Sequence, residues 1–217
     1  MNKVKIMVID DHPLVRNGFH QLIETEPDLV VCCEAASVSE AMEKFAQCTP
    51  DLVIVDLSLP DGNGLDLIKR LRAKNTDILI LVSSMYSENL YAERCLRAGA
   101  KGYINKQEAS EQVIFAIRQV LKGEIYISNE MTDTLLQRPP NNYLDSALSS
   151  VEHLSDRELE VFELIGRGVA TSEIAEKLHL SIKTIESHRA NMKLKLGLTS
   201  GSELMISAVH WVLASMK

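Results

Sequence analysis

An apolar run that ends in two aspartates, Val4-Lys5-Ile6-Met7-Val8-Ile9-Asp10-Asp11, lies near the start of this 217-residue chain. Three further apolar runs end in the same way, with polar residues directly after the last apolar one. They are Leu52–Val55 before Asp56, Ile78–Val82 before Ser83 and Ser84, and Gly102–Ile104 before Asn105 and Lys106. In an open parallel sheet, the carboxyl ends of neighbouring strands meet in one crevice. We therefore expect three carboxylates, a hydroxyl and an ammonium to meet there and to bind a divalent cation and a phosphoryl group.

Strand-like and helix-like patterns alternate from residue 3 to about residue 125. Runs of apolar and β-branched residues predict strands at Lys3–Ile9, Leu29–Glu34, Asp51–Asp56, Ile78–Ser83 and Gly102–Ile104. Periodic apolar residues predict a helix that begins at Pro13 and helices at Val38–Ala46, Leu65–Ala73, Asn89–Leu96 and Ala109–Leu121. The candidate apolar positions of the first helix are Leu14, Phe19, Leu22 and Ile23. The alternation indicates right-handed βαβ units, and so an α/β, doubly wound, five-stranded parallel sheet.

The residue types at the strand ends suit phosphoryl transfer. An aspartate can attack phosphorus and form an aspartyl phosphate, a reaction that needs little beyond alignment and charge neutralisation. Mg²⁺ prefers oxygen ligands and binds through one or two carboxylates, phosphate oxygens and water. Asp11 and Asp56 could supply those carboxylates, with Asp10 orienting a bound water. Lys106 would balance the added negative charge, and the Ser84 hydroxyl could donate to a phosphoryl oxygen.

The order of these residues resembles the receiver domain of bacterial two-component response regulators, which has a flavodoxin-like fold. The stretches DDHPLVR at 10–16 and GAKGY at 99–103 resemble the NarL/FixJ subgroup in particular. The resemblance implies a phosphoryl acceptor, Asp56, with Ser84 and Lys106 as catalytic partners, a metal site of Asp10, Asp11, Asp56 and the Ser58 carbonyl, and a switch pair of Ser84 and Tyr103. One departure concerns the loop after Lys106, where Gln107 takes the place of the proline of many receivers.

Residues 126–152 read as a linker, and residues 153–217 as a small all-α domain. The linker contains Pro139 and Pro140, which break a helix, although a short helix around Met131–Leu136 is compatible with it. In the following domain, a capping box at 155–158 begins the first helix. A short helix at Ser172–Leu178 then precedes a longer one at Ile182–Leu196, and a last helix spans Glu203–Met216. A short helix, a tight turn and a long basic helix predict a helix-turn-helix domain.

The long helix has a buried stripe and a polar face. The expected buried stripe consists of Ile185, Met192 and Leu196. Leu194 falls on the polar side, and the only role that we assign to it is packing near the helix end. Small and polar residues on such a face suit entry into a major groove. Glu186 and Ser187 could contact base edges. The full set of candidate DNA contacts is Lys183, Thr184, Glu186, Ser187, His188, Arg189, Ala190, Asn191, Lys193 and Lys195. The stretches LSDRELEV at 154–161, KTI at 183–185 and HRAN at 188–191 resemble the LuxR-type helix-turn-helix family. That resemblance implies that Glu203–Ala214 pairs DNA-bound protomers.

Composition is that of an ordinary soluble protein, with 46% hydrophobic and 24% charged residues and a net charge of −7. No apolar run is long enough to span a membrane, and no secretory signal is visible, so we expect a cytoplasmic protein with no membrane partner. The four cysteines lack metal-ligand spacing, and adjacent Cys32 and Cys33 should point to opposite faces of a strand.

The predicted function is that of a phosphorylation-controlled, DNA-binding transcriptional regulator. The resemblance implies a sensor histidine kinase as phosphoryl donor, promoter DNA as ligand, a phosphorylation-dependent homodimer, and RNA polymerase as a further partner. An alternative is an atypical regulator that is independent of phosphorylation and controlled by ligand or thiol oxidation. A phosphatase is disfavoured because Ser58 stands two residues after Asp56, where a general acid would be needed. We therefore expect a protein that is not an enzyme, apart from self-catalysed phosphoryl acceptance and slow autodephosphorylation. His12 could be a metal ligand, but we expect it to face solvent.

Overall fold

The computed structural model describes residues 3–108, 110–137, 151 and 153–215. It divides into two compact units, Met1–Leu135 and Leu136–Lys217. The predicted helix ends at Ala109 and Met216 and the linker residues 138–150 and 152 lie outside the described residues. Within the described ranges, no helix is both long and apolar enough to cross a membrane.

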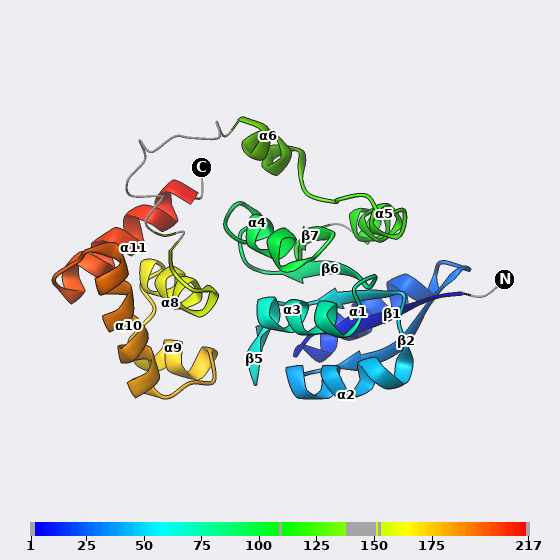
Figure 1. Cartoon of the computed structure of the whole chain (residues 1–217), viewed down its shortest axis with the longest axis horizontal. Helices are drawn as coiled ribbons and strands as arrows, with labels where there is room; N and C mark the ends of the chain where they lie inside the picture. Colours follow the sequence, from blue (N-terminus) through cyan, green and yellow to red (C-terminus); the bar gives the residue numbers. More distant parts are fainter. Residues whose placement is uncertain (1–2, 109, 138–150, 152, 216–217) are drawn as a thin grey trace. The chain divides into compact units, whose positions relative to one another are not determined.

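The first unit is built on a parallel sheet (Figure 1), which confirms the predicted fold class. Its strands are β1 (Val4–Ile9), β2 (Leu29–Ala35), β3 (Leu52–Val55), β6 (Leu79–Ser84) and β7 (Gly102–Asn105), in the order β2-β1-β3-β6-β7. The core of the sheet is apolar on both faces, and all four residues of β3 are buried. Strands that are covered on both faces read as continuous apolar runs, which is why they could be recognised in the sequence.

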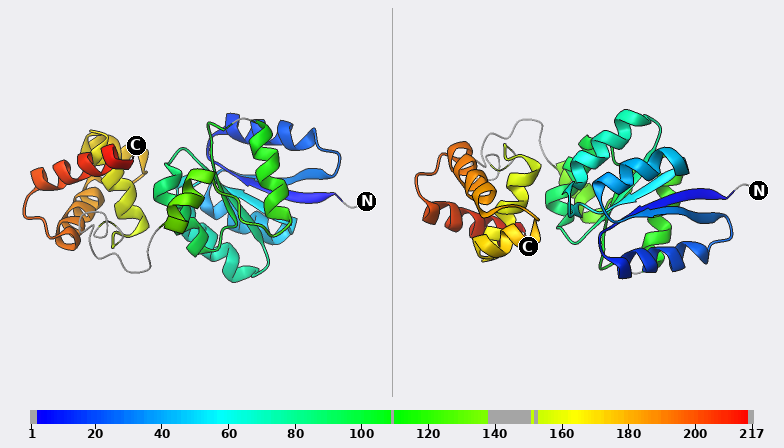
Figure 2. Two further views of the ribbon diagram at one scale, coloured as in Figure 1. Left: turned by 90° about the horizontal axis from the view of Figure 1, so that it is seen from above. Right: turned by 90° about the horizontal axis from the view of Figure 1, so that it is seen from below.

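Helices cover both faces of this sheet. They are α1 (Pro13–Glu24), α2 (Val38–Cys48), α3 (Gly64–Lys74), α4 (Glu88–Ala98) and α5 (Ser110–Leu121), followed by α6 (Asn129–Gln137). Figure 2 shows α1 and α5 on one face and α2 and α3 on the other. A small antiparallel hairpin, β4 (Ser58–Leu59) and β5 (Gly62–Asn63), connects β3 to α3. The doubly wound arrangement places the carboxyl ends of the strands at one edge of the sheet.

Two details of the first unit correct the sequence analysis. Leu14 was a candidate apolar position of α1, yet its side chain is 85% exposed, whereas Phe19 and Ile23 are buried. The Sγ atoms of Cys32 and Cys33 lie 3.9 Å apart rather than on opposite faces. The reason is a register shift in β2, where Val31 pairs with Ile6 but Cys33 pairs with Met7. The extra residue forms a β-bulge, which breaks the alternation of side chains.

The described part of the second unit from residue 153 onward is helical. Its helices are α8 (Asp156–Gly166), α9 (Thr171–Lys177), α10 (Ile182–Leu196) and α11 (Gly201–Ser215). The predicted capping box is present, because the Ser155 side chain accepts from the Glu158 backbone N–H and the Glu158 side chain accepts from that of Ser155. α10 begins after its N-cap Ser181 and ends at Gly197, whose φ of 66° is left-handed. The turn between α9 and α10 and the length of α10 agree with the helix-turn-helix prediction.

Gly64 is required because its backbone packs against the backbone of Asp56 and Leu57. It is the first residue of α3, and its backbone N–H donates to the Leu57 carbonyl at 2.9 Å. A Cβ atom at this position would overlap the Asp56 carbonyl oxygen and lie 2.6 Å from the Leu57 Cα. These are backbone atoms, so they cannot turn aside as a flexible side chain would.

Gly64→Ala is therefore expected to lower the free energy of unfolding by about 1–3 kcal/mol, because it overpacks backbone against backbone. Gly18→Ala is the matched control, since a Cβ on Gly18, within α1, would meet nothing within 4 Å. That change should raise the free energy of unfolding by about 0.5–1 kcal/mol. Urea unfolding of both variants measures the difference, and equal effects of the two changes would contradict the packing described here.

Candidate functional site

A buried ammonium joins two carboxylates at the carboxyl edge of the sheet. Lys106 Nζ lies 2.7 Å from Asp10 Oδ2 and 2.6 Å from Asp56 Oδ2. The side chains of both aspartates are 2% exposed and that of Lys106 is 6% exposed. The three residues come from the ends of β1, β3 and β7, which are far apart in the sequence. The parallel sheet thus brings together the acids and the cation that were picked out as strand-end residues.

The Asp10 carboxylate already has a protein partner on each oxygen. Oδ1 accepts a hydrogen bond from the His12 backbone N–H at 2.9 Å, and Oδ2 accepts from Lys106. The Asp10 backbone carbonyl accepts a further bond from Arg16 Nη1 at 2.6 Å. Asp10 is therefore held firmly, and its oxygens are less available to a metal ion than those of its neighbours. Arg16 was not singled out in the sequence, because nothing in the pattern shows which carbonyl an arginine will reach.

Asp56 and Asp11 leave oxygen atoms for a cation. Asp56 Oδ1 is buried and, among the described residues, no donor forms a hydrogen bond to it. Ligand atoms of Asp10, Asp11, His12 and Asp56 all lie within 4.8 Å of one another. Lys106 neutralises only one of the three clustered carboxylates. An unpartnered buried oxygen within a surplus of negative charge fits a divalent cation that prefers oxygen ligands.

His12 lies at the exposed rim of this cluster. Its side chain is 64% exposed, as expected, but its Nδ1 atom also lies 2.6 Å from Asp11 Oδ1. The ring therefore faces solvent with one edge and the acidic pair with the other. A contact with Asp11 competes with use of the same oxygen by a cation, so this geometry does not single out His12 as a ligand.

The electrostatics of the site oppose the ionised form of Asp56. Burial raises the pKa of Asp56 to about 6, with Lys106 lowering it and the nearby Asp10 raising it. For Lys106, burial acts to lower the pKa, but the attraction of Asp56 and Asp10 outweighs it and the pKa is raised. Lys106 thus stays charged, whereas the Asp56 carboxylate carries an electrostatic cost that a second cation would remove.

Ser84 and Tyr103 both contact Tyr86, a residue that the sequence analysis did not single out. The Ser84 Oγ atom accepts from the Tyr86 backbone N–H at 3.2 Å, and the Tyr103 hydroxyl donates to the Tyr86 carbonyl at 2.8 Å. Ser84 and Tyr103 are each 1% exposed. Ser84 also accepts, through its carbonyl, from the Lys106 backbone N–H at 3.0 Å. One loop residue therefore joins the two proposed switch residues.

Ser58 lies in β4, two residues after Asp56, and is half-buried. The Ser58 backbone N–H is the smallest of the influences that lower the pKa of Asp56. The backbone of Ser58 therefore lies next to the acidic cluster.

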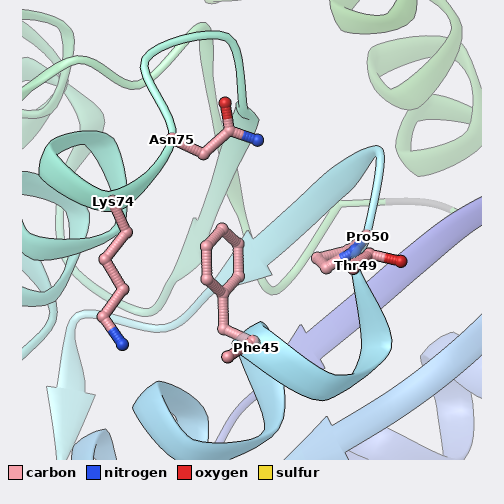
Figure 3. A pocket seen from close by; sticks show the side chains of 6 residues that line it. Phe45, Thr49, Pro50, Lys74 and Asn75 are labelled. Atoms are coloured by element: carbon pink, nitrogen blue, oxygen red, sulfur yellow. The ribbon is translucent and has the colours of Figure 1, made fainter.

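A separate hollow of about 430 Å³ opens beside the ends of α2 and α3 (Figure 3). It is lined by Phe45, Ala46, Thr49, Pro50, Lys74 and Asn75. These residues lie at the C-terminal ends of α2 and α3 and directly after them, so the hollow lies away from the carboxyl ends of the strands. It has one charged side chain and no carboxylate, and it offers nothing comparable to the acidic cluster.

The second unit presents α10 with a polar, mostly exposed face. Lys183, Glu186, Ser187, Ala190 and Asn191 are exposed, and Thr184, His188, Arg189 and Lys193 are half-buried. Ile185 and Met192 are fully buried, as predicted, but Leu196 is only half-buried. Burial lowers the pKa of His188, which favours its neutral form. These residues form the candidate DNA-contacting face.

Two residues of α10 differ from the sequence-based expectation. Lys195 Nζ lies 2.6 Å from Glu158 Oε2, whose side chain is 4% exposed, so this lysine ties α10 to α8. Leu194 is 81% exposed and does not pack at the helix end, which corrects the role assigned to it. Helical periodicity gives the direction of a side chain but not the partner that a neighbouring helix supplies. A long lysine can therefore be tied up by an acid that is distant in the sequence.

Family models match both units. The response regulator receiver domain model matches residues 6–118, and the model of bacterial regulatory proteins of the luxR family matches residues 152–208. The two matches correspond to the sheet unit with its acidic cluster and to the helical unit with α10.

Several known proteins are similar along nearly the whole chain. The oxygen regulatory protein NreC of Staphylococcus carnosus is 41% identical over 206 residues, which cover 93% of this chain and 95% of that one. RcsB of Salmonella enterica serovar Typhimurium, solved bound to promoter rprA in the presence of the phosphomimetic BeF₃⁻, is 26% identical. Its TM-score is 0.63, with 96% of this chain and 99% of that chain covered. A structure of two RcsB dimers bound to two parallel DNAs is 25% identical, with a TM-score of 0.58 and complete coverage of both chains at 100%.

Asp56→Asn is expected to raise the free energy of unfolding of the metal-free protein at pH 8. The pKa of Asp56 is about 6 when folded and 3.8 ordinarily, so ionisation costs the folded state more than the unfolded state. The cost grows as pH rises from about 4 to about 6 and is complete above that range. At roughly 1.4 kcal/mol per pKa unit, the variant gains at most about 3 kcal/mol, and the gain disappears near pH 4. Urea unfolding in a chelator at both pH values measures it, and no gain at pH 8 would contradict the electrostatics.

Proposed function

Because this chain belongs to the bacterial two-component response regulators of the NarL/FixJ type, a phosphorylation-controlled class of DNA-binding transcriptional regulator, we propose that its phosphoryl acceptor is Asp56. The observation that carries this proposal is the state of the two Asp56 oxygens. Oδ2 is held by Lys106, whereas Oδ1 is buried without a donor among the described residues. An acceptor needs one oxygen free to attack phosphorus while the other is held in place.

The reaction that these residues support is transfer of a phosphoryl group from a sensor histidine kinase to Asp56. The carboxylate oxygen of Asp56 forms the new bond to phosphorus, and the bond between phosphorus and the kinase breaks. Lys106 stays charged beside the acceptor and offsets the negative charge that arrives. The Ser84 Oγ atom accepts from the Tyr86 N–H, so its own hydroxyl hydrogen remains available to donate to a phosphoryl oxygen when the side chain turns toward it. Catalysis of this kind is mainly positioning and charge stabilisation.

Mg²⁺ is the proposed cofactor. Asp11, Asp56 and the Ser58 carbonyl would hold it directly, and Asp10, whose oxygens already have partners, would act through a bound water. When bound, Mg²⁺ would neutralise the acidic cluster and the incoming phosphoryl oxygens. The excess of negative charge around the unpartnered Asp56 oxygen supports this assignment. The chain is a response regulator and not a typical enzyme, so we limit its own chemistry to accepting the group and slowly hydrolysing the acyl phosphate.

The proposed switch passes through Tyr86. In the structure, Ser84 and Tyr103 hold the two backbone groups of this residue. If Ser84 turns toward the phosphoryl group, it gives up the Tyr86 N–H, and the loop that Tyr103 holds by the carbonyl can shift. Phosphorylation would then favour one arrangement of the β6–α4 loop, and the energy available for switching is its differential affinity for that arrangement.

DNA binding is assigned to the polar face of α10. Glu186 and Ser187, both exposed, are the proposed base contacts. The proposed phosphate contacts are Lys183, Thr184, His188, Arg189, Asn191 and Lys193. The small side chain of Ala190 would let the helix approach the DNA closely. Lys195 can contribute only if it leaves Glu158, so we rank it below Lys183. RcsB, the relative solved on promoter DNA, supports this use of the second unit.

The proposed assembly is a homodimer on promoter DNA, formed after phosphorylation. α11 exposes Met205, Ile206 and Leu213 at 50%, 57% and 58%, a patch that a second protomer could cover. The RcsB dimers on DNA support the same arrangement.

We further propose domain limits of 1–125 for the receiver, 126–152 for the linker and 153–217 for the DNA-binding domain. We also propose RNA polymerase as a partner and a cytoplasmic location. The phosphorylation-independent alternative is not favoured, because all the residues of the acidic cluster are present.

Chromatin capture with the wild type and Asp56→Ala, expressed in the same cells, tests this function. We expect promoter sites that the wild type occupies to be lost in the variant, because the acceptor oxygen is absent. Protein levels must be equal in the two strains, and Glu186→Ala serves as a control that should change site choice at unaltered phosphorylation. Equal occupancy by wild type and Asp56→Ala would contradict phosphorylation control through this residue.

A further inference from the structure

The turn that follows the acidic cluster is fastened to the start of a different helix. Asp61, between β4 and β5, accepts hydrogen bonds from the first two backbone N–H groups of α2. Its Oδ1 atom bonds the Val38 N–H at 2.6 Å, and its Oδ2 atom bonds the Ser39 N–H at 2.9 Å. The Ser39 hydroxyl also donates to Oδ2. Figure 1 shows β5 beside the start of α2.

α2 does not depend on Asp61 for an ordinary cap. Its N-cap is Ser37, whose Oγ atom accepts from the Glu40 backbone N–H at 3.2 Å. Glu40 in turn accepts from the Ala36 N–H at 2.6 Å. The first N–H groups of a helix lack partners within the helix, and a local cap satisfies only part of them. Asp61 takes the two that Ser37 leaves, and it brings a negative charge to the positive end of the helix.

The carboxylate of Asp61 is therefore occupied by the helix. Burial acts to raise the pKa of Asp61, but the bonds from Ser39 and Val38 outweigh it and the pKa is lowered. Next in the chain, a Cβ on Gly62 would lie 3.0 Å from Val38 Cγ2, so the turn packs tightly against the helix. On the other side of the hairpin, Asn63 Oδ1 accepts from the Leu65 N–H at 2.7 Å and begins α3.

We propose that Asp61 is a positioning residue for the metal site, acting through the backbone of the hairpin that carries Ser58. Ser58 opens β4, pairs with Asn63 in β5, and lies three residues before Asp61. The hairpin is thus held at the α3 side by Asn63 and at the α2 side by Asp61. Fixing both sides fixes the Ser58 carbonyl relative to Asp11 and Asp56. The proposal rests on the assignment of that carbonyl as a Mg²⁺ ligand.

The test is the affinity of the full-length chain for Mg²⁺ alone, measured by calorimetric titration, with Asp61→Asn and Ser37→Ala compared. Asp61→Asn keeps the size of the side chain but replaces one acceptor oxygen by an amide donor that faces the helix N–H groups. Ser37→Ala removes a cap from the same helix end and leaves both backbone bonds to Asp61 in place, although Ser37 Oγ also lies 3.3 Å from the Ser39 hydroxyl that donates to Asp61. We expect Asp61→Asn to weaken Mg²⁺ binding about tenfold and Ser37→Ala to leave it within about twofold, although both changes destabilise α2.

Unchanged affinity in Asp61→Asn, or an equal loss in Ser37→Ala, would overturn the inference, because the effect would then be absent or a general consequence of a weaker α2. If the wild type itself binds no Mg²⁺, the proposed metal site fails and the inference fails with it. Should Asp61→Asn not fold, Asp61→Glu takes its place. Asp61→Glu retains the charge and both acceptor oxygens at a longer reach. The inference then requires that Asp61→Glu bind Mg²⁺ less tightly than the wild type and Ser37→Ala do, with a loss of less than tenfold.

Discussion

The ion cluster in which Lys106 Nζ contacts Asp10 and Asp56 governs the rest of the first unit. Each of these charged side chains is at most 6% exposed, so each has lost most of its hydration. Attraction in the interior offsets that loss only when the geometry is good and the remaining lone pairs have partners. The cluster meets this condition for Asp10 but not for Asp56, whose Oδ1 atom has no donor among the described residues. The site is therefore stable enough to form, and it remains electrostatically incomplete.

That incompleteness connects the structure with its function. The Asp56 carboxylate has an uncompensated negative charge but a fixed position, so it can bind a cation and then a phosphoryl group with little reorganisation. The neighbouring contacts are suited to respond to such a change, because Ser84 and Tyr103 hold the same residue, Tyr86, by its two backbone groups. The aspartyl phosphate can shift this arrangement only by the difference in its interactions with the two states. Nearly complete switching from a 1:99 population needs about 5.5 kcal/mol.

The sequence predicted the parts of the fold that follow from local patterns. Buried strands with polar residues at their ends could be recognised, and so could Asp10, Asp11, Asp56 and Lys106 at those ends. The order of the helices in the helix-turn-helix domain followed from helical periodicity. Contacts between distant elements could not be foreseen. The bulge that places Cys32 beside Cys33 depends on pairing with β1, and the bond between Lys195 and Glu158 depends on the packing of α10 against α8. Leu14 follows a helical pattern yet lies in solvent. Asp61 and Tyr86 read as ordinary loop residues because their roles come from partners outside their own segments.

Whether Asp56 accepts the phosphoryl group is decided by locating that group on the chain. The full-length chain is incubated with acetyl phosphate, with and without Mg²⁺, and the modified residue is identified by peptide mapping in the wild type and in Lys106→Gln. We expect modification at Asp56 that requires Mg²⁺ and is much slower without the Lys106 ammonium. Modification at another residue, or equal labelling of both proteins, would contradict the assignment of this cluster as the phosphoryl-accepting site.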